Sequence, residues 1–105
     1  GDAVLSTQAK EVLANIAGII KNIPNDIRIE GHTDNLPINT PLYPSNWHLS
    51  VSRATNTAYF LMNDQGVSPE KVSIVGYSSY KPVAENETIE GKALNRRVDI
   101  VILKK

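Results

Sequence analysis

Three polar residues stand together where an alternating apolar segment ends, in the stretch IRIEGHTD at residues 27–34. Histidine and aspartate, present here as His32 and Asp34, act in many proteins as general bases or metal ligands. A metal site would need a third ligand, for which His48 is the candidate. The chain has only two histidines and no cysteine, so nitrogen and sulfur ligands are scarce. We therefore expect no metal site.

Hydrolytic chemistry has little support in the residues. The chain contains no GxSxG motif, no HExxH motif and no convincing pair of carboxylates. At the end of a strand, the His32 ring is expected to be satisfied by backbone groups rather than to serve as a general base. We expect no catalytic residue, no cofactor and no enzymatic activity.

A different combination of residues favours binding. Asp34 alone is typical of an Asx turn, and Arg53 alone is typical of an exposed helix surface. If the loop between them folds the helix back beside the strand, a carboxylate and a guanidinium face one small space. Helix amides from Asn46 onward would add positive potential. Such a site suits a zwitterion, whereas spacing alone favours a simple ion pair between Asp34 and Arg53.

Two amphipathic helices are predicted to position these residues. Apolar residues at three- and four-residue spacing predict a first helix that Pro24 terminates. A second helix runs from the SNW stretch at residues 45–47 to Gly66. The expected caps are Ser6 or Thr7 for the first helix and Ser45 or Asn46 for the second. The expected core face of the second helix consists of Val51, Ala54, Ala58 and Leu61.

Three strands alternate with the helices, which indicates a two-layer α/β sandwich. They are expected at residues 27–30, 72–75 and 98–103, with a short helical piece at residues 91–95. The last strand has apolar residues on both faces, which favours a central position in the sheet. Three strands make a thin sheet for two helices, so we expect a further strand before Leu5 in a longer protein.

Composition excludes several classes of partner. The 105 residues fit one domain, and eleven basic residues balance eleven acidic ones. No broad electrostatic field therefore attracts nucleic acid or anionic lipid. No apolar run in this chain approaches the roughly 20 residues of a membrane span. A charged partner must be bound locally by a few side chains.

Other polar and aromatic residues lie near the predicted site. Trp47 is expected to anchor the start of the second helix in the core. Arg96 and Arg97 precede the last strand, where alternation would turn one toward solvent and the other under a loop, toward a ligand.

Four motifs, in order along the chain, resemble one known family. They are IRIEGHTD, SNWHLSVSRA, VGYSSYKPV and EGKALNRRVDIVI, and they resemble the OmpA-like peptidoglycan-binding domain from Val4 onward. The long proline-bearing connection between GHTD and LSVSRA is most similar to flagellar motor stator proteins of MotB type (MotB, MotS, PomB).

The resemblance implies a fold and a ligand. The fold is an OmpA-C-like βαβαβ-type sandwich with a mixed sheet, whose first strand would lie largely before Gly1. The ligand is the diaminopimelate of the peptidoglycan stem peptide, held without cleavage by Asp34 and Arg53. Other matched positions are Thr33, Asn46, Asn95, Arg96 and Arg97, with Arg96 expected nearest the ligand. Ser78 stands where many relatives have glycine, so a different loop conformation is expected there.

The resemblance also implies a cellular role. Residues 1–105 would form a single peptidoglycan-binding domain, a fragment of a longer protein that anchors the flagellar stator to the cell wall. The expected location is extracytoplasmic, with an N-terminal transmembrane helix, absent from this chain, as the tether. A homodimer and a channel subunit of MotA type are the expected partners. The alternatives are a non-flagellar wall anchor of an outer-membrane protein or lipoprotein and, less favoured, a metal-dependent wall hydrolase.

Overall fold

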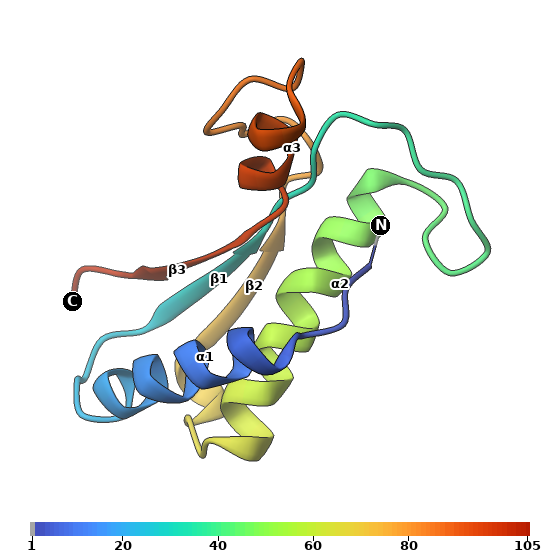
Figure 1. Ribbon diagram of the computed structural model, residues 1–105. Helices are drawn as coiled ribbons and strands as arrows, with labels where there is room; N and C mark the ends of the chain where they lie inside the picture. Colours follow the sequence, from blue (N-terminus) through green and yellow to red (C-terminus); the bar gives the residue numbers. More distant parts are fainter. Residues whose placement is uncertain (1) are drawn as a thin grey trace.

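The computed structural model describes residues 2–105, in which helices and strands alternate (Figure 1). A π-helical turn (Phe60–Asp64) extends the second helix, and a 3-10 turn (Pro69–Lys71) leads into the second strand. The main elements are α1 (Thr7–Ile20), β1 (Ile27–Gly31), α2 (Asn46–Tyr59), β2 (Val72–Gly76), α3 (Ile89–Asn95) and β3 (Val98–Ile102).

The three strands form a mixed sheet in the order β2-β1-β3. β1 runs parallel to β2 and antiparallel to β3, and Glu30 lies opposite Val75 on one side and Asp99 on the other. The mixed sheet is as predicted. The central position predicted for the last strand is wrong, because within residues 2–105 β3 pairs only with β1. Its Ile102 is 51% exposed, so apolar residues on both faces do not require burial on both sides.

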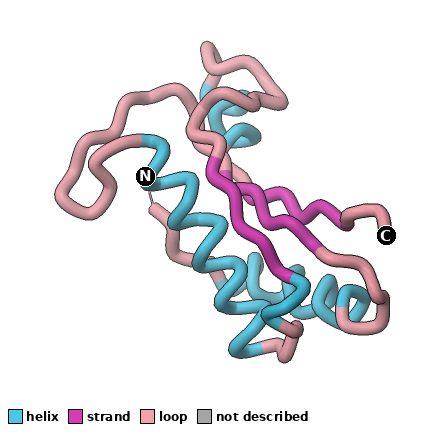
Figure 2. The backbone as a smooth tube through the Cα atoms, turned by 180° about the vertical axis from the view of Figure 1, so that it is seen from behind, coloured by secondary structure: helices cyan, strands magenta, loops and turns pink. Residues whose placement is uncertain are grey.

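Helices α1 and α2 cover one face of the sheet, whereas the other face carries no helix within the described chain (Figures 1 and 2). Ile27 and Ile29 of β1 point toward the helices and are completely buried. They join a core whose other buried members are Leu13, Ala17, Ile20, Ala54, Ala58, Leu61 and Val67. The two-layer α/β fold is thus confirmed.

Side-chain caps set the helix starts. The Ser6 hydroxyl accepts a hydrogen bond from the Ala9 amide at 3.0 Å and caps α1. Ser45 caps α2 in the same way, so in each pair of candidate caps the first residue is correct. α1 ends at Ile20, earlier than the predicted stop at Pro24, and Gly66 follows α2 and its π-helical turn with a φ of 75°.

A close approach between α2 and β1 decides which face of α2 is buried. A side chain at Gly31 would place its Cβ 1.8 Å from the carbonyl oxygen of Ser50, so only glycine allows this contact. The helix therefore buries its small residues, including Ser50 and Ala54. The predicted burial of Val51 is wrong, since it lies off this face and is 45% exposed.

Trp47 is half-exposed rather than anchored in the core, so that expectation is also wrong. Its ring stacks on Tyr80, with 5.5 Å between ring centroids. The first turn of α2 extends past the end of the sheet (Figure 1). The indole of Trp47 therefore packs against Tyr80 of a loop instead of against core residues. Among residues 2–105 no helix combines the length and the apolar character needed to cross a membrane.

Candidate functional site

The end of β1 delivers Asp34 into a loop whose backbone is fixed on both sides. The amide of His32 donates to the Arg97 carbonyl, and the amide of Thr33 donates to the Ser78 carbonyl, both at 2.9 Å. Asp34 Oδ1 then accepts from the Leu36 amide at 3.1 Å, which is the predicted Asx turn. The carboxylate is thereby held in one orientation and is largely buried.

Ser78 is part of this support and has an unusual backbone. Its φ is 56°, and no other described non-glycine residue has a positive φ. The loop thus has the left-handed conformation that glycine favours, although a serine occupies the position. The Ser50 hydroxyl accepts a hydrogen bond from the Ser78 amide at 3.0 Å, so α2 holds this strained residue in place.

Helix α2 supplies Arg53, whose guanidinium is tied to two backbone carbonyls. Its Nη1 donates to the carbonyl of His32 at 2.8 Å, and its Nε donates to the carbonyl of Asp2 at 3.0 Å. Within residues 2–105 its Nη2 donates to no protein acceptor. Burial lowers the pKa of Arg53 from its ordinary value, while the Asp34 carboxylate opposes this shift. The group stays charged at neutral pH.

The ion pair with Asp34 is made by Arg96 and not by Arg53. Arg96 Nη1 lies 2.7 Å from Asp34 Oδ2, just after the end of α3. The simple Asp34–Arg53 ion pair, the alternative on spacing alone, is therefore wrong.

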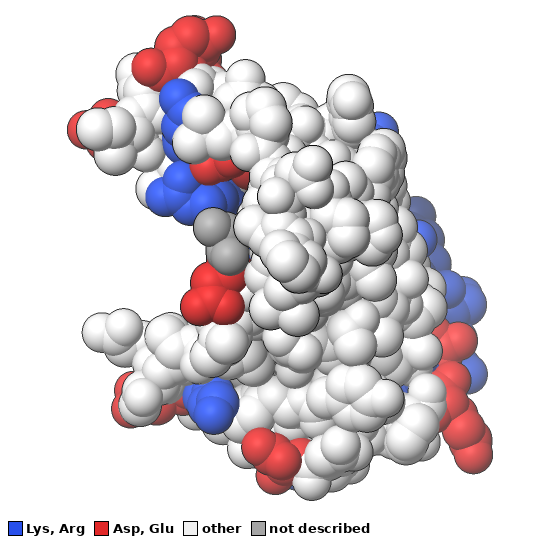
Figure 3. All heavy atoms as spheres, turned by 90° about the vertical axis from the view of Figure 1, so that its right-hand side faces the viewer, with Lys and Arg blue, Asp and Glu red and all other residues white. Residues whose placement is uncertain are grey.

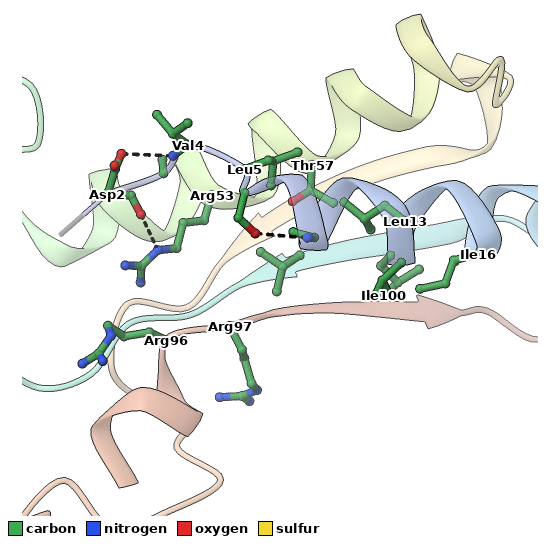
Figure 4. A pocket seen from close by; sticks show the side chains of 15 residues that line it. Asp2, Val4, Leu5, Leu13, Ile16, Arg53, Thr57, Arg96, Arg97 and Ile100 are labelled. Carbon is green, nitrogen blue, oxygen red and sulfur yellow. Dashed lines mark hydrogen bonds between the residues drawn. The ribbon is translucent and has the colours of Figure 1, made fainter. Parts of the chain in front are cut away.

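The neighbouring Arg97 points to the other side of the backbone and pairs with Asp99 (Figure 4). The two arginines do face different environments, but Arg97 is the one under a loop, where it donates to the Lys81 carbonyl, and Arg96 beside the pocket is the more exposed. The expectation that the arginine under the loop would be the one directed toward the pocket is therefore wrong.

Asn95 does not line the pocket but stabilises the loop that precedes α3. Its side chain is 1% exposed and makes four hydrogen bonds to the preceding loop. The amide oxygen accepts from Val83 and Ala84, and the amide nitrogen donates to the Ala84 carbonyl and to Asn86. These bonds fix the loop against α3 and so fix the chain just before Arg96.

A pocket of about 300 Å³ brings the predicted residues together. One carboxylate faces two guanidinium groups there, so the pocket carries a net positive charge. Sequence reasoning missed the apolar part of its wall, for which the proline-bearing loop was the only available signal. The lining residues are Thr33, Asp34, Leu36, Pro37, Ile38, Asn46, Leu49, Arg53 and Arg96.

A second hollow of about 360 Å³ adjoins the pocket and shares Arg53 and Arg96 with it. The space-filling view shows basic side chains gathered at the upper border of this hollow and acidic ones below it (Figure 3). Its wall also includes residues 2–6, Thr57 and Arg97, together with apolar residues of α1 and β3 such as Leu13 and Ile100 (Figure 4). Both spaces therefore open beside the same two guanidinium groups.

The two histidines lie outside the pocket. His48 is exposed, and its Nδ1 is 2.8 Å from the capping hydroxyl of Ser45. His32 is buried on the helix-free face, where its ring stacks on Tyr77 and makes no hydrogen bond to the backbone. The structure therefore does not assemble His32, Asp34 and His48 into one site. It groups His32 with Glu30 and Asp99, which sequence reasoning did not foresee.

The pocket has the groups needed to bind a small charged ligand. Asp34 can accept hydrogen bonds from an ammonium group, and Arg53 and Arg96 can each hold a carboxylate. Thr33 is the hydroxyl residue of the pocket wall, and its hydroxyl donates to the Asp34 carbonyl, while the ring of the adjacent His32 makes no hydrogen bond within the described chain. The lining residues therefore show no hydroxyl paired with a general base. The arrangement is suited to binding.

A model of the OmpA family matches residues 1–96 of the chain. The chain belongs to the OmpA family. This OmpA-family chain is 46% identical over 95 residues to motility protein B of Bacillus subtilis, covering 90% of this chain and 35% of that protein. It is 38% identical over 96 residues to the peptidoglycan-binding protein ArfA of Mycobacterium bovis, covering 88% of this chain and 27% of that protein.

A solved structure gives the same fold. The C-terminal domain of Helicobacter pylori MotB matches this OmpA-family chain with a TM-score of 0.93 and 27% sequence identity. The match covers 99% of this chain and 80% of that one. The chain spans less than half the length of the curated relatives that it matches.

Proposed function

We propose that this chain binds peptidoglycan without cleaving it, through the diaminopimelate residue of the stem peptide. The observation that carries the proposal is the pocket that joins Asp34 to Arg53 and Arg96 in a chain of the OmpA family. The free end of diaminopimelate bears an ammonium and a carboxylate on one carbon, so its charges complement those of the pocket. The name of the mycobacterial relative supports the same ligand class.

In this proposal each charged group has a separate task. Asp34, oriented by the Leu36 amide, accepts the ammonium group of the ligand. Arg53 offers its Nη2 to the ligand carboxylate while its other nitrogens hold the backbone. Arg96 pairs with the carboxylate of Asp34 and adds a second positive charge at the pocket. Thr33 and Asn46 complete the polar wall around the ligand.

We further propose that the bound wall anchors the stator of a flagellar motor. The similarity to motility protein B and to the MotB domain supports this role. The full-length protein would lie on the periplasmic or cell-wall side of the cytoplasmic membrane, tethered by its own transmembrane helix. It would act as a homodimer with a channel subunit of MotA type. Torque generation requires a stationary anchor, which the covalent peptidoglycan mesh supplies.

Calorimetric titration with a muropeptide that contains diaminopimelate tests the ligand. Asp34→Asn and Arg53→Ala are each expected to weaken binding at least tenfold, about 1.4 kcal/mol, because each removes one partner of the zwitterion. Arg28→Ala is the matched control, since Arg28 lies on the helix-free face, and its affinity should not change. Circular dichroism checks that each variant folds. Unchanged binding in both pocket variants would contradict the proposal.

A wall anchor outside the flagellum is the second candidate, because ArfA is named for peptidoglycan binding alone. A swimming assay distinguishes the two roles. Cells whose full-length protein carries Asp34→Asn should be non-motile if the protein anchors a stator. They should swim normally if it anchors another envelope structure. Incubation with purified sacculi should release no soluble fragments under either role, since both involve binding without hydrolysis.

A further inference from the structure

The helix-free face of the sheet carries a second group of polar side chains, on the opposite face from the proposed ligand. Glu30 of β1 and Asp99 of β3 lie directly opposite one another in the antiparallel pair. His32 follows β1 on the same face, one residue beyond its end. One potential ligand atom from each of the three side chains lies within 4.8 Å of the others.

His32 is a buried member of this group, 2% exposed, whose ring nitrogens have no hydrogen-bond partner within the described chain. Its Nε2 points between the carboxylates, 3.3 Å from Asp99 Oδ2 and 3.9 Å from Glu30 Oε1. A buried polar group without a hydrogen bond is costly, by about 1–3 kcal/mol. Such a group indicates that something else satisfies it.

We propose that Glu30, His32 and Asp99 bind a divalent transition-metal ion, with Zn²⁺ as the best match. One imidazole nitrogen and two carboxylate oxygens are a donor set that zinc accepts, and solvent would complete the coordination shell. The sequence gives no sign of this site, since the third ligand comes from a different strand. It is independent of the proposed peptidoglycan pocket.

The surroundings of the three side chains fit this use. Tyr77 stacks on the imidazole, with 5.3 Å between ring centroids, and so fixes the orientation of the ring. Burial lowers the pKa of His32, and Arg97 lowers it further against the opposing effect of Asp99 and Glu30. Metal ions bind the neutral imidazole, and this shift favours that form.

Two arginines orient the carboxylates of Glu30 and Asp99 and also limit their affinity for a metal ion. Arg28 Nε holds Glu30 Oε2 at 2.7 Å, which leaves Oε1 turned toward His32. Arg97 Nε donates to both oxygens of Asp99, at 3.0 and 3.1 Å. Hydrogen-bonded carboxylates are typical of metal sites. The two positive charges compete with the ion, so we expect weaker binding than in structural zinc sites.

A bound ion would join the central strand β1 to the edge strand β3. Because binding to the folded state alone stabilises that state, Zn²⁺ should raise the melting temperature in a concentration-dependent manner. A peptidoglycan ligand plays no part in this effect. The metal site can therefore be tested whether or not the proposed function is correct.

Calorimetry with ZnCl₂ on the metal-free chain, together with thermal melts, tests the proposal. We expect saturable binding of one ion per chain and a higher melting temperature. Asp99→Asn and Glu30→Gln should each weaken binding about tenfold or more, since each replaces a charged ligand by an amide. His32→Gln should do the same. Arg28→Gln should strengthen binding, because it removes a competing cation.

Matched controls separate this site from adventitious binding. His48→Gln and Asp64→Asn change exposed residues of the same types outside the cluster and should leave the affinity unchanged. Absence of saturable binding at millimolar Zn²⁺ would overturn the proposal. So would an affinity that falls with His48→Gln but not with Asp99→Asn, Glu30→Gln or His32→Gln. The partly exposed Asp99 tests the site even if the buried His32→Gln variant fails to fold.

Discussion

Asp34 and His32 are separated by one residue, yet their side chains belong to sites on opposite faces of the sheet. On the pocket side, Arg53 is held by backbone carbonyls, which use its donors without neutralising its charge. On the helix-free side, Glu30 and Asp99 each have an arginine of their own. The pocket therefore keeps a net charge for a ligand, whereas the charges of the other face largely cancel.

The comparison shows that the partner of a charged side chain matters as much as its type. An arginine bound to carbonyls retains its full charge and its unused donors. An arginine bound to a carboxylate forms a pair that contributes about 0–1 kcal/mol when partly exposed, and its charge is largely offset by that of its partner. Three variants, each with a matched control, test this contrast between the two faces.

The largest effect is expected at Gly31, which brings the pocket side of β1 against α2. Gly31→Ala places a methyl group 1.8 Å from the Ser50 carbonyl oxygen, so the helix must move away from the strand. We expect the free energy of unfolding to fall by about 3 kcal/mol or more. Urea denaturation measures the change. Muropeptide binding should weaken as well, because Arg53 moves with the helix.

Gly18 provides the matched control for this variant. A Cβ at Gly18 meets no atom within 4 Å, and the residue lies inside α1. Gly18→Ala should therefore stabilise the chain by about 0.5–1 kcal/mol. A loss of stability at Gly18 similar to that at Gly31 would show that the close contact is not the cause.

An intermediate effect is expected from the two adjacent arginines. Arg96→Gln removes the partner of Asp34 and one positive charge of the pocket, and should weaken muropeptide binding about tenfold, or 1.4 kcal/mol. Arg97→Gln removes the partner of Asp99 and leaves the ion pair between Arg96 and Asp34 intact, so that affinity should change much less. Calorimetry on both variants makes the measurement. Equal losses would mean that the two faces are not functionally distinct.

The smallest effect is expected at Ser78, which supports the pocket side through Thr33. Its positive φ costs a non-glycine residue about 1 kcal/mol, which Ser78→Gly would remove. The greater freedom of glycine in the unfolded chain offsets part of this gain, leaving about 0.5 kcal/mol of added stability. Urea denaturation can resolve it. Ser79→Gly has no such strain to relieve and should destabilise slightly.

The sequence was sufficient for the elements and for the main pocket residues. Hydroxyl caps and the apolar period determine α1 and α2 locally, so each pair of candidate caps contained the correct residue, Ser6 or Ser45. Asp34 and Arg53 line one pocket, which is what we expected if the loop between them folds the second helix back beside the strand end.

Features that depend on pairing between strands could not be predicted. The edge position of β3 depends on which strand it pairs with. Its apolar pattern shows which faces of the strand are apolar but not which strands lie beside it. The approach of Asp99 to Glu30 requires the register of that pairing. The exposure of Trp47 depends on how far α2 extends beyond the sheet, which helical periodicity does not encode.

The hydrogen bonds from Arg53 to the backbone have a consequence for affinity. A free arginine side chain has about 2 kcal/mol of rotamer entropy, much of which is lost when a ligand immobilises it. Here the carbonyls of His32 and Asp2 immobilise the guanidinium during folding. A ligand then meets a preorganised group, and binding is stronger without any additional contact.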